Sequence, residues 1–159
     1  MLLFAYGSNM AAAEMSAYAP EARFIGPACL RGFRLEFRRR SIRRGGGAAD
    51  VVQREGHEVW GVLYELASFE SLDHKEAEGD SYRRREVELD AEGERITAFV
   101  YEVIDKEPEE VPPTHAYAEL VRDGARERGL PAAWLDELER RIGEVGEPRP
   151  AEGPGHAVG

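Results

Sequence analysis

Apolar and polar positions predict strands in the first two-thirds of the chain and helices in the last third. Runs rich in β-branched and aromatic residues, bounded by turn-forming residues, are typical of strands. Such runs lie at residues 2–6, 24–37, 48–53, 58–66, 81–89 and 95–103. Gly26-Pro27 and Gly32 interrupt the second run, so we expect one or two strands there. Glu55-Gly56 predicts a turn, and Glu92-Gly93 joins the last two runs at a spacing that predicts a hairpin.

Four further segments predict helices. Residues 10–18 are helix-prone with Asn9 as a candidate N-cap, and Ser68 is a candidate N-cap for a short helix ending near residue 77. Thr114 and Pro131 are expected to begin two C-terminal helices, the first of which ends near residue 128. Their apolar stripes comprise Tyr117, Leu120, Val121 and Gly124 in the first helix, and Trp134, Leu138 and Ile142 in the second.

Strands followed by helices, without βαβ alternation, indicate an α+β fold with a mainly antiparallel sheet. A chain of 159 residues suits one domain with one core, which we assign to residues 1–145. Residues 146–159 are rich in Gly and Pro with little to bury, and we expect a disordered tail there.

The charge of the chain limits its partners. With 21 Lys and Arg against 31 Asp and Glu, the net charge is −10, which disfavours nucleic-acid binding because that binding requires neutralised phosphates. One basic cluster comprises Arg38, Arg39, Arg40, Arg43 and Arg44. Since three glycines follow, we interpret residues 38–47 as a solvated flexible loop; the alternative is binding of nucleic acid or an anionic surface. The sequence shows no apolar run near the ~20 residues of a membrane-spanning helix and no basic leader, so we expect no membrane partner and a cytoplasmic location.

Nothing in the sequence predicts a metal site or a reactive thiol. Cys29 is the only cysteine, and the four histidines stand singly without a metal-ligand spacing. Cys29 lies in an apolar run, where a buried free thiol is the expected state.

The segment Tyr6-Gly7-Ser8-Asn9 connects an apolar strand to a helix. Such a turn presents backbone N–H groups at the helix start, and Gly7 allows close approach of a ligand. These N–H groups are candidates to hold a carboxylate or a developing oxyanion. The alternative is an ordinary turn with an N-cap.

Helical spacing singles out Glu76 among several carboxylates at residues 68–79. At about 100° per residue, Glu76 lies on the same helix face as Phe69 and Leu72, whereas Glu78 lies nearly opposite. A carboxylate on an apolar face is costly to ionise, which brings its pKa toward the range of a general acid or base. The alternative is an ion pair with an arginine at 83–85 of the next strand. Asp73 also lies near this face, and we interpret it as a surface carboxylate.

Several motifs together resemble the γ-glutamyl cyclotransferase family across residues 2–142. These are the Tyr-Gly-Ser-Asn turn at residues 6–9, the Gly-rich turn before Val-Trp-Gly-Val at 59–62, Leu-Asp-x-x-Glu at 72–76 with Tyr82 beyond it, and the segment from Pro112 to Pro131. The family usually has Gly directly after its catalytic Glu, but this chain has Ala77, and a Glu-Gly pair occurs at Glu78-Gly79. Glu78 is therefore the alternative catalytic residue, although the motif spacing favours Glu76.

The resemblance implies a small mixed barrel with outer helices and a site at one mouth. It also implies intramolecular aminolysis, in which the α-amine of a γ-glutamyl group attacks its own γ-carbonyl to form 5-oxoproline and release an amine or amino acid. No metal or cofactor takes part in this reaction. Glu76 would move the proton, and the substrate would be held by Tyr6, Gly7, Ser8, Asn9, Tyr82 and Tyr117.

Two points stay open at this level. A non-catalytic binding module that keeps the γ-glutamyl pocket is the alternative function. The leaving amine is not specified, and the loop at residues 38–47 is a candidate to contact it.

Overall fold

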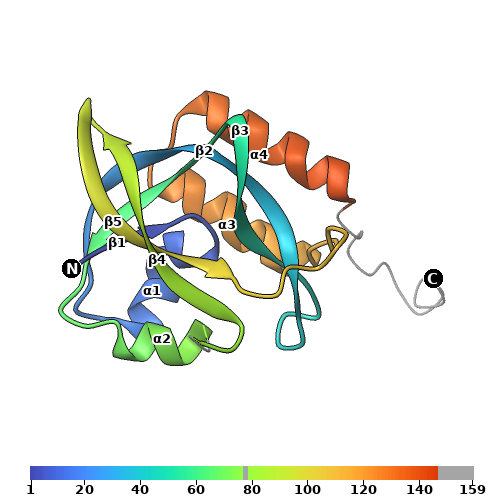
Figure 1. The fold of residues 1–159 in the computed structure, drawn as a ribbon, viewed down its shortest axis with the longest axis horizontal. Coiled ribbons are helices and arrows are strands. Elements are labelled where there is room, and N and C mark those ends of the chain that lie inside the picture. The colour runs from blue at the N-terminus through green and yellow to red at the C-terminus, as the bar shows by residue number, and fades with distance from the viewer. Residues whose placement is uncertain (77–78, 147–159) are drawn as a thin grey trace.

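The chain folds into a closed β-barrel with helices packed outside it (Figure 1). The computed structural model describes residues 1–76 and 79–146. The strands, in the order β1-β3-β2-β4-β5 around the barrel, are β1 (Leu2–Ala5), β2 (Arg23–Ser41), β3 (Gly46–Glu65), β4 (Tyr82–Ala91) and β5 (Glu94–Val103). The helices are the 3₁₀ turn η1 (Ser8–Met10), α1 (Ala12–Tyr18), α2 (Glu70–Glu76), α3 (His115–Glu127) and α4 (Ala132–Val145). The predicted α+β, mainly antiparallel barrel with outer helices is confirmed.

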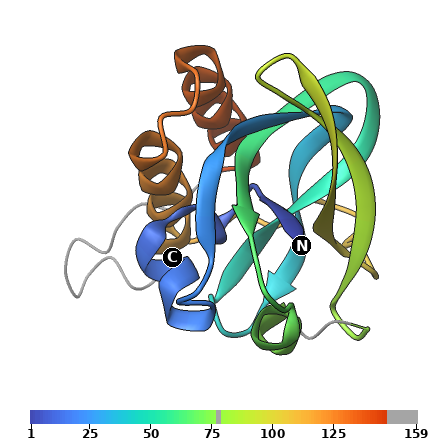
Figure 2. The same cartoon turned by 90° about the vertical axis from the view of Figure 1, so that its left-hand side faces the viewer.

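The helices occupy two regions of the barrel surface. The C-terminal helices α3 and α4 run along one flank, whereas α1 and α2 lie near one end (Figures 1 and 2). Within the described residues, no helix has the length and apolar character needed to cross a bilayer.

β2 and β3 form one antiparallel hairpin of 19 and 20 residues. Residues 24–37 belong to one strand, and the turn predicted at Glu55-Gly56 is wrong. Gly32 has φ 81° and Gly56 has φ 83°, and both fall within the same register shift between the two strands. The left-handed backbone that glycine tolerates therefore produces a bulge that bends the hairpin without ending its pairing.

The predicted loop at residues 38–47 is too long, because β2 continues to Ser41 and β3 begins at Gly46. Arg38 is held in the strand: its Nε donates to Glu36 Oε1 at 2.7 Å, and its Nη1 donates to the backbone oxygen of Pro108 at 2.9 Å. The run of like charges suggested a solvated loop. In the structure, Arg38 is instead bound by the Glu36 carboxylate and by the backbone at Pro108.

The β4–β5 hairpin confirms the turn predicted at Glu92-Gly93. Glu92 has φ 49° and Gly93 has φ 82°, the left-handed pair that a two-residue type I′ turn requires. The register that follows buries Val87 and Leu89 of β4 in the barrel.

β1 closes the barrel although it has only four residues. It pairs antiparallel with β3, from Leu2 opposite Glu65 to Ala5 opposite Val62, and parallel with β5 through Leu3 and Phe99. The chain passes directly from this closing strand into the Tyr6–Asn9 segment, so closure also fixes where that segment lies.

The two C-terminal helices follow the sequence predictions. Thr114 Oγ1 accepts the Tyr117 N–H at 3.1 Å and caps α3, and the residues buried by α4 include the predicted stripe of Trp134, Leu138 and Ile142. In α3, Leu120 is only half-buried, and Ala118 and Ala125 are buried in its place. α4 ends at Val145, so the predicted tail, except for Gly146, lies outside the described residues.

The N-terminal helix differs from its prediction. Residues 8–10 form the 3₁₀ turn η1, and α1 begins only at Ala12 after an N-cap, Ala11, that supplies no side-chain hydrogen bond. Asn9 is not the cap, because its side chain turns to Glu76 and Lys75 instead.

Gly47→Ala is expected to destabilise the fold, because a Cβ there would lie 1.8 Å from the carbonyl oxygen of Val111. The segment cannot simply withdraw, since Gly47 N–H donates to Pro112 O at 2.9 Å. We expect the free energy of unfolding in urea to fall by about 3 kcal/mol, near the top of the usual range for overpacking. Gly26→Ala is the control, because a Cβ at that position meets nothing within 4 Å. Equal denaturation midpoints for the two variants would contradict this packing argument.

Candidate active site

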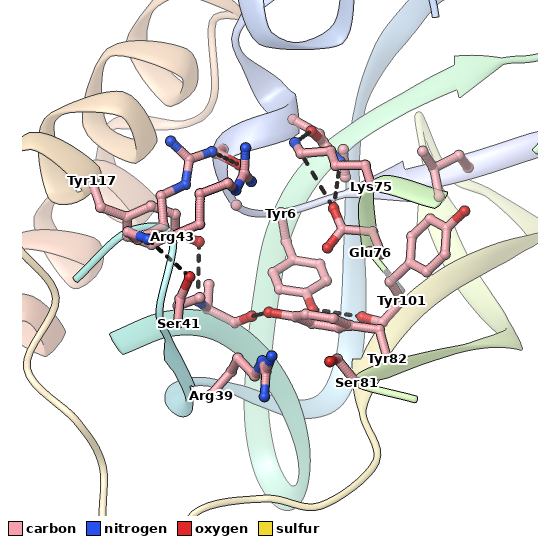
Figure 3. Close-up of a pocket in the computed structure, with 18 of the residues that line it drawn as sticks. Tyr6, Arg39, Ser41, Arg43, Lys75, Glu76, Ser81, Tyr82, Tyr101 and Tyr117 are labelled. Atoms are coloured by element: carbon pink, nitrogen blue, oxygen red, sulfur yellow. Dashed lines mark hydrogen bonds and ion pairs between the residues drawn. The ribbon is translucent and has the colours of Figure 1, made fainter. Parts of the chain in front are cut away.

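A cavity of about 280 Å³ opens where the segment after β1, the end of α2 and the β2–β3 loop meet (Figure 3). All the residues predicted to form the site line it: Tyr6, Gly7, Ser8, Asn9, Glu76, Tyr82 and Tyr117. They come from the segment that follows β1 and from η1, α2, β4 and α3, so the fold brings together residues that are remote in the sequence. Their chemical roles remain predictions.

Glu76 projects from the last position of α2 toward the cavity (Figure 3), and Leu72 of the same helix and Phe69 just before it are buried. Its side chain is 16% exposed, and its Oε1 accepts a hydrogen bond from Asn9 Nδ2 at 3.3 Å. Burial raises the pKa of Glu76, and the nearby Lys75 charge and the Asn9 hydrogen bond only partly oppose that shift. The geometry thus provides a carboxyl group whose proton affinity is greater than that of an exposed glutamate.

The alternative pairing of Glu76 with an arginine of β4 is wrong. Arg84 Nε instead donates to Asp73 Oδ1 at 2.7 Å. Arg83 and Arg85 both pair with Glu102. Asp73 is also not a plain surface carboxylate, since it accepts a 2.6 Å hydrogen bond from the Tyr101 hydroxyl.

The Tyr6–Asn9 segment packs closely against the wall of the cavity. A Cβ at Gly7 would lie 3.2 Å from the Tyr117 hydroxyl and 3.4 Å from Ala49 Cβ, so glycine fits a narrow space. Ser8 and Asn9 are buried, and η1 leaves its first N–H groups without acceptors inside the turn. This is the arrangement from which backbone donors can reach an anionic group.

Three buried tyrosines form another wall. Tyr82 donates to the carbonyl oxygen of Ala49 at 3.3 Å, and Tyr117 accepts the Ala49 N–H at 3.0 Å. Tyr6 donates to the carbonyl oxygen of Tyr101 at 2.5 Å. Burial raises the pKa of Tyr117 to about 12, and burial also raises the pKa values of Tyr6 and Tyr82. All three hydroxyls therefore stay protonated at neutral pH.

The sequence analysis did not include four cationic cavity residues among the site residues, although it named the loop at residues 38–47 as a candidate to contact the leaving amine. Arg39, Arg43, Arg44 and Lys75 also line the cavity. Arg44 lies 3.5 Å from Ser8 Oγ and from Glu14 Oε1, so the basic cluster is partly turned inward and is not wholly a solvated loop. A basic cluster in an acidic chain was the available signal, but which members face inward depends on the strand register.

Cys29 does not line this cavity, and its Sγ donates to Glu58 Oε2 at 2.6 Å. Burial raises the pKa of the Cys29 thiol to about 12, as does the Glu58 carboxylate beside it. Within residues 1–76 and 79–146, no three His, Cys, Asp or Glu side chains are grouped so as to hold a metal ion. Glu78, the alternative catalytic residue, lies outside the described residues.

Comparison with known proteins gives one consistent family. The family described as Gamma-glutamyl cyclotransferase, AIG2-like, matches residues 3–120. Gamma-glutamylcyclotransferase from Bos taurus is 34% identical over 145 residues, which cover 86% of this chain and 76% of the bovine protein. The Homo sapiens gamma-glutamylcyclotransferase is 33% identical with the same coverage of 86% and 76%. A solved gamma-glutamyl cyclotransferase structure superposes with a TM-score of 0.84 at 31% identity, covering 97% of this chain and 92% of that chain.

With the family profile, the relatives and the superposition in agreement, the chain belongs to the γ-glutamyl cyclotransferase, AIG2-like family, and the predicted enzymatic function is confirmed.

Proposed function

We propose that this cyclotransferase converts a γ-glutamyl amino acid to 5-oxoproline and a free amino acid, with Glu76 as its single general acid and base. One observation carries the assignment of Glu76. It is the one carboxylate among the described residues that line the cavity, and burial raises its pKa. A titratable side chain with a shifted pKa at the wall of a cleft is typical of a functional site.

The reaction needs one proton acceptor that later becomes a donor. The α-ammonium of the substrate loses a proton to Glu76, and the free amine attacks the γ-carbonyl carbon. A new C–N bond closes the five-membered ring, and the bond to the leaving nitrogen breaks as Glu76 returns the proton to that nitrogen. The ring nitrogen then gives up its second proton through Glu76 to the released amine, which leaves as an ammonium, so that Glu76 ends the cycle as a carboxylate. Because the two reacting groups belong to one folded substrate, the cavity supplies a high effective concentration.

The Tyr6–Asn9 segment is suited to stabilise the negative charge that develops on the γ-carbonyl oxygen. Backbone N–H groups of Gly7 and Ser8 lie at the start of η1 and border the cavity. Preorganised N–H donors of this kind stabilise an oxyanion without reorganisation during the reaction. The hydroxyl of Tyr117 accepts the Ala49 N–H and keeps its own proton as a further donor for binding the substrate, whereas the Tyr82 hydroxyl donates to Ala49 and can accept from the substrate.

The charges around the cavity favour a leaving group that carries a carboxylate. Four cationic side chains face one carboxylate among the described lining residues. Arg39 has no ion-pair partner within the described part of the chain, and it lines the cavity together with Ser81 and Tyr82 (Figure 3). An unpaired cation in a cleft favours an anionic substrate. This supports a γ-glutamyl amino acid over a γ-glutamyl amine.

Glu76→Gln is expected to lower the rate of 5-oxoproline formation from γ-glutamyl-alanine by about 10²–10⁴-fold, the usual contribution of general acid–base catalysis. The measurement is chromatographic detection of 5-oxoproline under single-turnover conditions. Glu70→Gln is the matched control, because Glu70 is exposed at the other end of α2 and should keep the wild-type rate. Equal rates for Glu76→Gln and wild type would exclude Glu76 as the base, and a wild-type chain without turnover would favour the binding-module alternative.

The same substitution is expected to raise the melting temperature at neutral pH. The raised pKa of Glu76 means that the folded chain binds this proton more tightly than the unfolded chain. The stabilising effect of the proton is complete below the ordinary value of 4.5 and is lost as the pH rises through the folded value. Calorimetry should therefore find Glu76→Gln more stable than wild type at neutral pH, with a difference that vanishes in acid. A difference independent of pH would contradict this linkage.

Arg39→Met is expected to reduce kcat/KM for γ-glutamyl-alanine by about tenfold or more, as for loss of a charged hydrogen bond. It should have little effect on γ-glutamyl-ethylamide, which differs only by lacking the carboxylate of the leaving group. Arg40→Met is the control, because its side chain is 68% exposed and does not line the cavity. A parallel loss on both substrates would mean that Arg39 does not bind the leaving-group carboxylate.

A further inference from the structure

Lys75 is a buried cation in contact with the Glu76 carboxylate. Its side chain is only 2% exposed, and its Nζ lies 3.9 Å from Glu76 Oε1 and 3.7 Å from Glu14 Oε2. The same ammonium donates to Asn9 Oδ1 and lies 4.6 Å from the centre of the Tyr18 ring. A buried ammonium is costly unless it is paired, and every one of these neighbours offers negative charge or an electron-rich face.

We propose that Lys75 is a positioning residue that orients the Asn9 amide and thereby holds Glu76 as a carboxylate before the substrate arrives. This inference rests on the proposed role of Glu76 as the base. It adds the residue that keeps the base ready in its proton-accepting form.

The direction of the hydrogen bonds supports the orienting role. An ammonium group has three donors and no acceptor, so Lys75 can bind the Asn9 amide only through Oδ1. The amide NH₂ must then face the other way, and it donates to Glu76 Oε1 at 3.3 Å. A donor aimed at a carboxyl oxygen favours the ionised form, because that form only accepts. The hydrogen bonds from Lys75 to Asn9 and from Asn9 to Glu76 therefore run in one direction.

The charges that face Glu76 support the same conclusion. Burial raises the pKa of Glu76, and of the groups that oppose this shift Lys75 contributes most, followed by Asn9, Arg43 and Arg44. The hydroxyls that face it from the barrel and α3 are neutral and belong to Tyr6, Tyr82, Tyr101 and Tyr117. Lys75 is thus the main cation that keeps a buried carboxylate ionised.

Glu14 of α1 completes the arrangement. When Glu76 takes the proton of the substrate, Lys75 loses one of its two carboxylate neighbours. Glu14 Oε2, 3.7 Å from Nζ, remains and keeps the ammonium compensated. Burial lowers the pKa of Lys75, and Glu14 continues to oppose that shift when Glu76 is neutral, so that Lys75 can stay charged through the proton transfer. The protonated Glu76 beside this cation is a stronger acid toward the leaving nitrogen.

The test is the pH dependence of kcat/KM, whose acidic limb reports the ionisation of the base in the free enzyme. Lys75→Met keeps most of the side-chain volume but removes the charge, so the acidic limb should move to higher pH by about 1–3 units. Above the new limb the rate should return to within a few-fold of wild type. Lys75→Arg restores the charge and should return the limb toward its wild-type position. Arg40→Met, which removes an exposed cation outside the cavity, should leave the limb unmoved.

Glu14→Gln gives a second test that leaves the Lys75 side chain in place, and the acidic limb is expected to move in the opposite direction. Removing this carboxylate leaves Lys75 and Arg44 less compensated, so the acidic limb should move to lower pH. A structural role for Lys75, such as packing α2 against Tyr18, predicts equal losses at every pH with no movement of the limb. Equal losses at every pH in Lys75→Met would overturn the proposal. If Lys75→Met does not fold, the proposal is overturned by an acidic limb that stays in place in both Lys75→Gln and Glu14→Gln.

A titration without substrate separates this inference from the proposed function. The Glu76 carboxyl signal, assigned by its absence in Glu76→Gln, can be followed by ¹³C NMR as a function of pH. In Lys75→Met it should titrate at higher pH than in wild type, whether or not Glu76 is the catalytic base. An unchanged titration would exclude the role of Lys75, whereas full activity of Glu76→Gln would remove only the catalytic assignment.

Discussion

The pairing of β1 along both of its edges is the constraint on which the site depends. Four residues bridge β3 and β5, and the Leu66 N–H donates to the Met1 oxygen at 2.8 Å beside the same strand. The segment that follows β1 therefore has no freedom to drift from the barrel mouth. α2 follows β3, the partner of β1, so closure of the barrel brings Asn9 to Glu76 across 67 positions of sequence.

The way charges are buried separates the supporting carboxylates from Glu76. Glu36 is completely buried, yet Arg38 and Arg54 bind it with short hydrogen bonds, and the pKa of Glu36 is lowered. Asp50 is equally buried, and burial raises its pKa as it does that of Glu76, but the Lys106 ammonium and two backbone N–H groups satisfy its oxygens. Glu76, by contrast, accepts one hydrogen bond from the Asn9 amide, lies 3.9 Å from the Lys75 ammonium and borders the cavity. A carboxylate left partly uncompensated beside open space is suited to exchange a proton, whereas a fully bonded one is suited to support the fold.

Local signals predicted the elements whose geometry is settled by neighbours in sequence. Glu92-Gly93 specifies a two-residue turn because its length alone sets the register, and Thr114 specifies a helix start because its hydroxyl reaches a backbone group within the same turn. The glycines of β2 and β3 were less decisive. A glycine at positive φ suits a turn and a bulge equally well, and only the partner strand opposite Gly56 selects the bulge.

The sequence by itself determined the class of fold, the family and the face of α2 that carries Glu76, because these follow from periodicity and from motifs of fixed spacing. It did not determine that Asn9 would serve Glu76 and not cap a helix, nor that Lys75 would be buried beside it. Tertiary structure decided both, since the Asn9 amide and the Lys75 ammonium find their partners only when β1, α1 and α2 meet at the barrel mouth. Side-chain hydrogen bonds between remote segments depend on that closure, and no local spacing encodes it.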